Sequence, residues 1–223
     1  MKKFELTNEF IANRFGTKLF RIRALVEFGD VEAGELGGYV EKESNLGHDD
    51  NAWVYGNARV YGDALVYDNA RVYDNAWVYG DAQVSGDALV YGNARVYGNA
   101  RVCGDAQVSG DALVYGNAWV YGDAQVSGDA RVCGDARVCG NGDYAYAHGF
   151  GSVNRTTTFF RLKDGGVGVR CGCFYGTLAQ FRDKIRETHG ETKKAQEYLM
   201  LADLMELRFE EDENEVGNRK YVE

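Results

Sequence analysis

Residues 51–140 read NAWVYG-NARVYG-DALVYD-NARVYD-NAWVYG-DAQVSG-DALVYG-NARVYG-NARVCG-DAQVSG-DALVYG-NAWVYG-DAQVSG-DARVCG-DARVCG. An alanine recurs at every sixth position from Ala52 to Ala136, and a valine follows each alanine two positions later. The unit is therefore Asn/Asp-Ala-x-Val-y-Gly/Asp, repeated fifteen times without a gap. Internal periodicity of this kind decides the fold, because every unit has to adopt the same local structure.

Each hexapeptide predicts a very short strand followed by a corner. On an extended strand, residues two apart point to the same side, so alanine and valine share one side and x and y share the other. The Gly and Asn/Asp pair suits the corner because these residues tolerate a positive φ. So short a strand buries its apolar side only by stacking on copies of itself. Three hexapeptides close a coil of eighteen residues, and the fifteen units predict a three-sided parallel β-helix of five coils.

The first segment, residues 1–50, lacks the hexapeptide phase. Phe4 and Leu6 alternate with polar residues, residues 13–16 read as a turn, and residues 20–24 alternate again. This pattern predicts a β-hairpin that caps the first coil, where an open strand edge would otherwise invite aggregation. Several glycines then lead into an irregular first coil.

The segment after the repeats, residues 141–209, is predicted to be a small ββαα domain. Residues 156–162 and 167–174 read as two strands around a turn. Cys171 and Cys173 alternate onto the same side of the second strand as two valines. This placement predicts small buried core residues, and we expect no metal site there.

Two helices complete the predicted domain. Thr177 and Gln180 form a capping-box pattern at the start of the first helix, and residues 192–209 read as the second. The apolar residues expected to face the core are Leu178, Phe181, Ile185, Tyr198, Leu201, Leu204 and Met205. Residues 210–223 begin with five acidic side chains among six positions and are expected to form a solvated acidic tail.

Composition argues against two classes of partner. A net charge of −9 and a pI of about 4.9 argue against nucleic acid. No apolar run approaches the roughly 18 residues needed to cross a bilayer, so we expect no membrane association. The chain begins with Met1-Lys2-Lys3 and a charged, alternating stretch instead of an apolar signal sequence, and it contains an odd number of cysteines, five. A reducing cytoplasm is therefore the expected compartment.

The Val-y-Gly-Asn/Asp-Ala-x pattern resembles the hexapeptide repeats of left-handed β-helix proteins, a family that includes trimeric acyltransferases. The whole chain is similar to hexapeptide-repeat proteins of phages and prophages, through RIRAL at 21–25, GGYVEKE at 37–43 and VRCGCFYGTL at 169–178. This resemblance implies a left-handed coil and a homo-oligomer, with a trimer favoured. It also implies the cytoplasm of an infected or lysogenic host cell as the location.

Acyl or sugar-nucleotide transfer is the enzyme hypothesis that the resemblance raises. In that family a histidine on the outside of a coil deprotonates the acceptor. Residues 51–140 contain no histidine and no interrupting loop. His48 and His148 lie at the two ends of the repeats, and His189 lies in the last turn of a predicted helix. We therefore predict no catalytic residue and no cofactor, and we keep a transferase as an alternative.

The outward positions x and y carry nine Tyr, three Trp and six Arg. At eighteen-residue spacing, one side of the prism aligns two columns, which are Tyr61, Tyr79, Tyr97 and Tyr115, and Arg59, Trp77, Arg95, Leu113 and Arg131. Self-stacking along the coils is one explanation. An oligomer or partner interface is the favoured one, because Tyr, Trp and Arg are frequent interface anchors. The same groups could also hold a nucleotide through phosphate pairing and base stacking.

A second candidate surface is the polar, cationic approach to the C-terminal hairpin. It contains Asn154, Arg155 and Arg161, together with the threonines at 156–158. Ordinary solvent-facing strand polarity explains the same residues, so the two interpretations stay open.

The leading functional hypothesis is a non-enzymatic, phage-type binding or scaffold protein. It would be oligomeric through the solenoid and would engage or inhibit a host defence factor. One alternative is a sponge that sequesters a nucleotide second messenger between subunits, and another is the transferase. The expected partners are accordingly further copies of the chain, a host protein or a small phosphate-bearing ligand.

Overall fold

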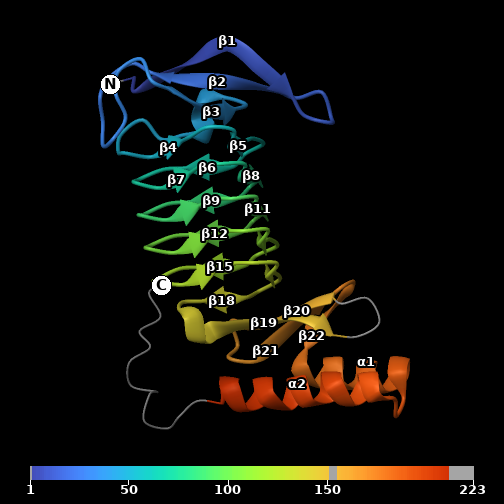
Figure 1. Cartoon of the computed structure of the whole chain (residues 1–223). Coiled ribbons are helices and arrows are strands. Elements are labelled where there is room, and N and C mark those ends of the chain that lie inside the picture. Colours follow the sequence, from blue (N-terminus) through green and yellow to red (C-terminus); the bar gives the residue numbers. More distant parts are fainter. Residues whose placement is uncertain (1, 151–154, 211–223) are drawn as a thin grey trace.

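The computed structural model describes residues 2–150 and 155–210 and has a three-sided β-solenoid at its centre (Figure 1). The first face, called the ladder face below, consists of β5 (Arg59–Val60), β8 (Trp77–Gly80), β11 (Arg95–Gly98), β14 (Leu113–Val114) and β17 (Arg131–Val132). The second face consists of β4 (Trp53–Val54), β7 (Arg71–Val72), β10 (Leu89–Val90), β13 (Gln107–Val108) and β16 (Gln125–Val126). The third face consists of β6 (Leu65–Val66), β9 (Gln83–Val84), β12 (Arg101–Val102), β15 (Trp119–Val120) and β18 (Arg137–Val138).

Neighbouring strands of each face pair in parallel with a shift of eighteen residues. On the ladder face, Arg59 lies opposite Trp77, and Trp77 lies opposite Arg95. Every alanine and valine at the repeated positions from Ala52 to Val138 is at most 1% exposed. These small and branched side chains fill the narrow interior, and the predicted three-sided parallel β-helix is confirmed.

The corners of the solenoid require residues that adopt a positive φ. Gly98 has a φ of +69°, and a Cβ at this position would lie 3.1 Å from the backbone nitrogen of Gly116 in the next coil. Asp68 replaces glycine at one corner with a φ of 58°. Its carboxylate accepts a hydrogen bond from the backbone N–H of Gly86 at 3.0 Å. This bond gives the Gly86 N–H, which lies in the next coil, an acceptor.

The N-terminal segment caps the first coil, as predicted. β1 (Phe4–Ala12) and β2 (Lys18–Ala24) form an antiparallel hairpin, and β3 (Leu36–Val40) joins β2 to β5 of the ladder face. The ammonium group of Lys3 donates to the Ala52 carbonyl oxygen at 2.9 Å, and burial lowers the pKa of this amine to about 8. The cap is therefore joined to the solenoid by both a continuous sheet and a buried amine.

A four-stranded antiparallel sheet and two helices follow the last coil. The elements are β19 (Tyr144–Phe150), β20 (Arg155–Arg161), β21 (Val167–Cys171), β22 (Phe174–Thr177), α1 (Leu178–His189) and α2 (Lys193–Phe209), and short 3-10 turns, η1 (Glu43–Asn45) and η2 (Asn141–Asp143), flank the solenoid. Strand β20 places Phe160 in the core of the solenoid and Phe159 in the separate core under the helices. The C-terminal sheet is therefore a second cap that carries its own core.

The two predicted strands of this domain belong to a larger sheet. The sequence did not predict β19, and the expected strand at 167–174 is interrupted at Gly172, whose φ is +58°. The predicted capping box is confirmed, since Thr177 accepts from the Gln180 N–H and the Gln180 side chain accepts from the Thr177 N–H. Leu204 is 54% exposed, so its predicted core position is wrong.

The core positions of α2 differ from the expected set. The buried residues of this helix are Ala195, Tyr198, Ala202, Met205 and Phe209. Two of these five residues are alanines, and α2 packs against α1. None of the described helices is long and apolar enough to cross a membrane. The predicted acidic tail, from residue 211 onward, lies outside the described residues.

Candidate binding surface

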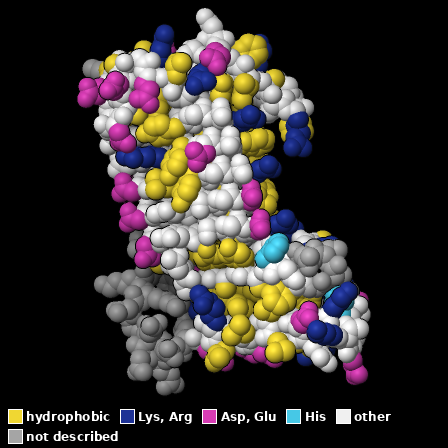
Figure 2. All heavy atoms as spheres, viewed as in Figure 1, with side chains coloured by type: hydrophobic (Ala, Val, Ile, Leu, Met, Phe, Trp, Pro, Cys, Tyr) yellow, Lys and Arg dark blue, Asp and Glu magenta, His cyan; other side chains and the backbone are white. Residues whose placement is uncertain are grey.

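The ladder face forms the floor of a recess between the two caps. The β1–β2 hairpin and the C-terminal domain both project beyond the solenoid on the side where β5, β8 and β11 lie (Figure 1). Lys and Arg side chains follow this edge of the solenoid in the space-filling view (Figure 2). The caps therefore frame one face of the prism and leave it accessible from the side.

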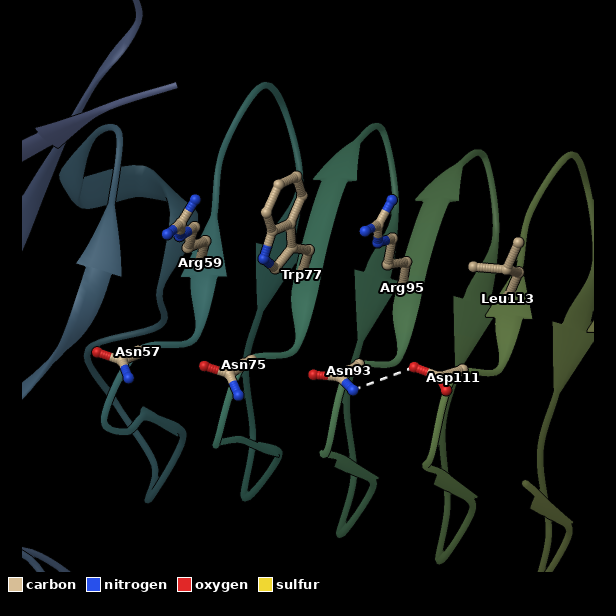
Figure 3. A pocket seen from close by; sticks show the side chains of 8 residues that line it. All are labelled: Asn57, Arg59, Asn75, Trp77, Asn93, Arg95, Asp111 and Leu113. Atoms are coloured by element: carbon tan, nitrogen blue, oxygen red, sulfur yellow. Dashed lines mark hydrogen bonds between the residues drawn. The ribbon is translucent and has the colours of Figure 1, made fainter. Parts of the chain in front are cut away.

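A groove of about 500 Å³ runs along the ladder face across four coils. One row of its lining residues is Arg59, Trp77, Arg95 and Leu113, and the row beside it is Asn57, Asn75, Asn93 and Asp111 (Figure 3). The guanidinium carbons of Arg59 and Arg95 lie 5.0 and 4.8 Å from the centre of the Trp77 ring. Trp77 is therefore held between two cations in successive coils.

The tyrosine column predicted beside this groove stacks as a continuous ladder. The ring centres of Tyr61, Tyr79, Tyr97 and Tyr115 lie 4.9–5.0 Å apart, with interplanar angles of 2–4°. Burial raises the pKa of all four hydroxyl groups. Cys133 continues the column in the last coil and is only 3% exposed. The ladder therefore runs from the N-terminal cap to the C-terminal cap.

The arginines of the ladder face have no carboxylate partner. Among the described residues, Arg59, Arg95 and Arg131 make no ion pair and no side-chain hydrogen bond, and the Arg59 Nε atom is buried without a partner. Elsewhere in the chain, Arg71 pairs with Asp30 at 3.0 Å. The ladder face thus carries a column of three unpaired arginines, although the chain as a whole has a net charge of −9.

The stacking already present on this face limits which ligands it can take. The faces of the inner ladder rings contact one another, and both faces of Trp77 are covered by guanidinium groups. A nucleotide base requires an open aromatic face of about its own size. The surface therefore offers ring edges, hydroxyl groups and guanidinium groups at regular intervals, which is a pattern suited to another protein surface.

A second hollow continues the groove below Leu113, where the ladder face meets the C-terminal domain. It is lined by Arg131, His148, Arg155 and Thr156, among others. The Nδ1 atom of His148 lies 2.8 Å from the Thr156 hydroxyl and 3.8 Å from the Asp129 carboxylate. Both contacts use the same ring nitrogen, so the three residues do not form a proton relay of the kind used in nucleophilic catalysis.

The structure separates the residues of the second predicted surface. Arg155 is exposed and lines the hollows on both sides of the C-terminal sheet. Arg161 is only 6% exposed and does not belong to any cationic surface, which corrects the prediction. Its guanidinium pairs with Asp143 at 3.3 Å and donates to the Phe209 carbonyl oxygen at 3.1 Å. Asn154 lies outside the described residues.

The two cysteines of the C-terminal sheet also differ from each other. Cys171 is half-buried, and its sulfur accepts a hydrogen bond from the Thr157 hydroxyl at 3.2 Å. Cys173 is exposed in the turn that begins at Gly172, so its predicted core position is wrong. Within residues 2–150 and 155–210, no group of three or more His, Cys, Asp or Glu side chains is placed to hold a metal ion.

Comparison with known proteins supports the repeat architecture. A family model described as YdcK Beta solenoid repeat matches residues 52–67, 64–80, 82–96, 106–122 and 124–140. These matches fall within the solenoid and leave both caps outside. No curated protein matches the chain. The chain is thus a repeat β-helix protein with two caps of its own.

Proposed function

We propose that this protein is a non-enzymatic binding scaffold that assembles as a homotrimer through the ladder face. The observation that carries the proposal is the set of unpaired arginines beside a self-stacked tyrosine column in the recess between the caps. Such groups repeat at the strand spacing of about 4.8 Å, and a second copy of the solenoid has the same spacing. A copy of the chain is therefore the partner whose surface matches this face in register.

The distribution of charge favours a threefold over a twofold arrangement. A twofold contact would set the ladder face against itself, and juxtaposed arginine columns would cost several kcal/mol. A threefold rotation of triangular prisms instead brings each face against a corner of the next copy. The corner that follows the ladder carries an exposed polar column, which is Asp63, Asp81, Asn99, Asn117 and Asp135.

The heights of these charges match in a parallel trimer. Asp63 lies in the same coil as Arg59, and Asp135 lies in the same coil as Arg131, four residues later in each case. A threefold axis parallel to the solenoid keeps every coil of one copy level with the same coil of the next. Arg131 would then meet Asp135 of the neighbouring copy, and Arg59 would share Asp63 of that copy with Lys42, which pairs with Asp63 at 2.6 Å within one chain. Such pairs would neutralise the two ends of the arginine column.

The assembled trimer would present three C-terminal domains around one axis. The resemblance to phage proteins supports a protein of the host cell, in its cytoplasm, as the target of these domains, in keeping with inhibition of a defence factor. A nucleotide sponge is less favoured because the aromatic faces of the ladder and of Trp77 are already covered. A transferase is less favoured because no histidine occurs in the repeats.

Light scattering tests the assembly. The Tyr79→Glu and Tyr97→Glu double variant places two carboxylates at the centre of the contact and should reduce the particle from three times 24.7 kDa to the mass of one chain. The matched control is Tyr73→Glu with Tyr91→Glu, since these rings stack at 5.1 Å on the second face, outside the recess. The control should keep the trimer mass. A monomeric wild type, or equal loss in both variants, contradicts the proposal.

Charge reversal tests the predicted pairing directly. Arg59→Glu with Arg131→Glu should dissociate the trimer, and so should Asp63→Lys with Asp135→Lys. Combining all four substitutions restores opposite charges at each coil and should restore the trimer mass. Failure of the combined variant to reassemble, while its circular dichroism stays β-rich, would show that the arginine column meets some other surface.

A further inference from the structure

The C-terminal domain contains a pocket of about 260 Å³ that is separate from the recess. It opens between strands β21 and β22 on one side and helices α1 and α2 on the other. Its lining residues are Arg155, Cys171, Cys173, Phe174, Phe181, Lys184, Ile185, Thr188, His189 and Tyr198. Not one of these side chains is a carboxylate, in a chain with 34 acidic residues.

The inner wall of this pocket is apolar and aromatic. Phe181 and Ile185 are 4% and 3% exposed and belong to the core of the domain, and Phe174 packs against them at the edge. The Phe181 ring lies 5.4 Å from Phe174 and 5.8 Å from Tyr198 between ring centres. The rings meet at angles of 42° and 81°, so they form a notch and not a closed stack. A planar apolar group fits such a notch through edge-to-face contacts.

The polar groups at the floor of the pocket are already engaged. The Tyr198 hydroxyl donates to the Phe150 carbonyl oxygen at 3.2 Å, and the Cys171 sulfur accepts from Thr157 at 3.2 Å. Burial, as the larger cause, and the neighbouring Cys171, as the smaller one, raise the pKa of Tyr198 to about 12. The phenol therefore stays neutral at physiological pH.

The rim of the pocket is cationic. The guanidinium group of Arg155 lies directly over Gly172. A side chain at position 172 would clash with this group. Among the described residues, Arg155 makes no ion pair and no side-chain hydrogen bond. Lys184 contributes a second positive charge and pairs with the exposed Glu187, one turn along α1. The His189 ring also lines the pocket and stacks on Tyr198 with 6.0 Å between the ring centres.

We propose that this pocket binds a small carboxylic acid with an aromatic or branched apolar body. The apolar body lies against Phe174, Phe181 and Ile185, and the carboxylate lies at Arg155, which offers a planar pair of donors. The volume is just below the range of about 300–1,000 Å³ that is typical of drug-sized ligands, so the ligand is smaller than these. Arg155 also borders the hollow beside the recess, but the proposal requires no trimer contact and goes beyond the proposed function.

Ligand-observed fluorine NMR on the full chain tests this site. The probes are 4-(trifluoromethyl)benzoate and its neutral analogue, 4-(trifluoromethyl)benzamide, which have the same apolar body. The benzoate resonance should broaden on titration, and the benzamide should bind at least about tenfold more weakly. Equal binding of the two probes, or no broadening with either, overturns the proposal.

Variants locate the probe. Arg155→Gln should weaken benzoate binding at least about tenfold and leave benzamide unchanged. Arg101→Gln, on the third face and away from both the recess and the pocket, is the matched control and should leave both unchanged, since among the described residues this exposed arginine makes no ion pair. Thr188→Trp, at an exposed position on the rim, should block both probes. Equal effects of the two arginine variants would assign the binding to general charge attraction and overturn the site. Light scattering on the same samples reports the trimer, so the two proposals fail separately.

Discussion

The solenoid and the C-terminal domain build their cores in different ways. In the solenoid, each side chain meets the same kind of residue above and below, as Val96 meets Val78 and Val114. In the C-terminal domain each contact occurs once, as when Phe181 meets Phe159 with an interplanar angle of 78°. The first region repeats one contact, and the second depends on a set of unique ones.

This difference has consequences for how each region responds to change. A solenoid is close to a one-dimensional stack, in which each coil adds a similar increment of stability through its nearest neighbours. Removing one whole coil therefore changes the length and not the kind of contact. A small domain with a single mixed core has no such spare unit, and loss of one central contact affects the whole. Deletions and substitutions in the two regions test this contrast.

Deleting part of the solenoid has the largest expected effect. Removal of residues 87–104, one full coil, should leave a folded protein with both caps in register, because Gly86 then leads into an equivalent corner at Asp105. Removal of residues 87–92 alone should turn the C-terminal cap by about a third of a turn. The recess then loses one of its two walls, and the trimer should be lost.

Thermal melts and sedimentation velocity distinguish these deletions. The variant that lacks eighteen residues should melt cooperatively. Its mass should be three times that of the shortened chain. The six-residue deletion should aggregate or remain monomeric. If both variants behave alike, then the position of the caps around the solenoid does not matter, and the recess is not the assembly surface.

The repeating contacts of the solenoid were predictable because sequence phase alone places their side chains. The alternation of Ala and Val fixes which side is buried, and the eighteen-residue coil fixes which residues align. Counting in steps of eighteen residues predicts the columns that begin at Arg59 and Tyr61. The N-terminal hairpin followed from ordinary two-residue alternation, because one of its sides is solvated.

The unique contacts of the C-terminal domain were not predictable in the same way. Strand β20 is covered on both sides, by the solenoid and by the helices, so its burial does not alternate. The local sequence therefore does not indicate that Arg161 is buried in an ion pair. Strand β19 contains alanines and tyrosines whose burial depends on docking. Cys173 follows the phase of its strand in sequence but leaves it at the Gly172 turn. Each of these outcomes depends on tertiary structure that local pattern does not contain.

Removing the buried ion pair tests how far the C-terminal domain depends on one contact. Arg161→Met should lower the free energy of unfolding by about 3–5 kcal/mol, because Asp143 loses a buried counter-charge and the Phe209 carbonyl loses a donor. Arg155→Met, on the same strand but exposed, should change it by less than about 0.5 kcal/mol. Urea unfolding of both variants gives the comparison, and similar losses would mean that Arg161 contributes no special contact.

The two cysteines provide a smaller test within one strand and its turn. Cys171→Ala should lower the free energy of unfolding by about 1–2 kcal/mol, because the fully buried Thr157 hydroxyl loses its acceptor. Cys173→Ala should have an effect below about 0.5 kcal/mol, since that side chain is exposed. Equal losses in urea unfolding would indicate that both sulfurs belong to the core, as simple alternation suggests.

The smallest expected effect concerns the pH dependence of the tyrosine ladder. Burial raises the pKa of Tyr79 and Tyr97 above the ordinary value of 10.0, so the folded state holds these two protons more tightly than the unfolded chain does. Their contribution to stability is therefore complete below pH 10 and is lost as the pH rises through the raised pKa values. Because the rings remain half exposed, solvent screening keeps each contribution well below the roughly 1.4 kcal/mol of one full pKa unit.

Replacing both residues by phenylalanine keeps the stacked rings and removes the two titrating groups. Tyr79→Phe with Tyr97→Phe should match the wild type in urea unfolding near neutral pH and should lose less stability than the wild type between about pH 9 and about pH 11. If the ladder is a sum of equivalent coils, then either single variant should show about half of this difference. A single variant that accounts for the whole difference would mean that the rungs of the ladder are not equivalent, and the contrast between repeated and unique contacts would then not hold on this face.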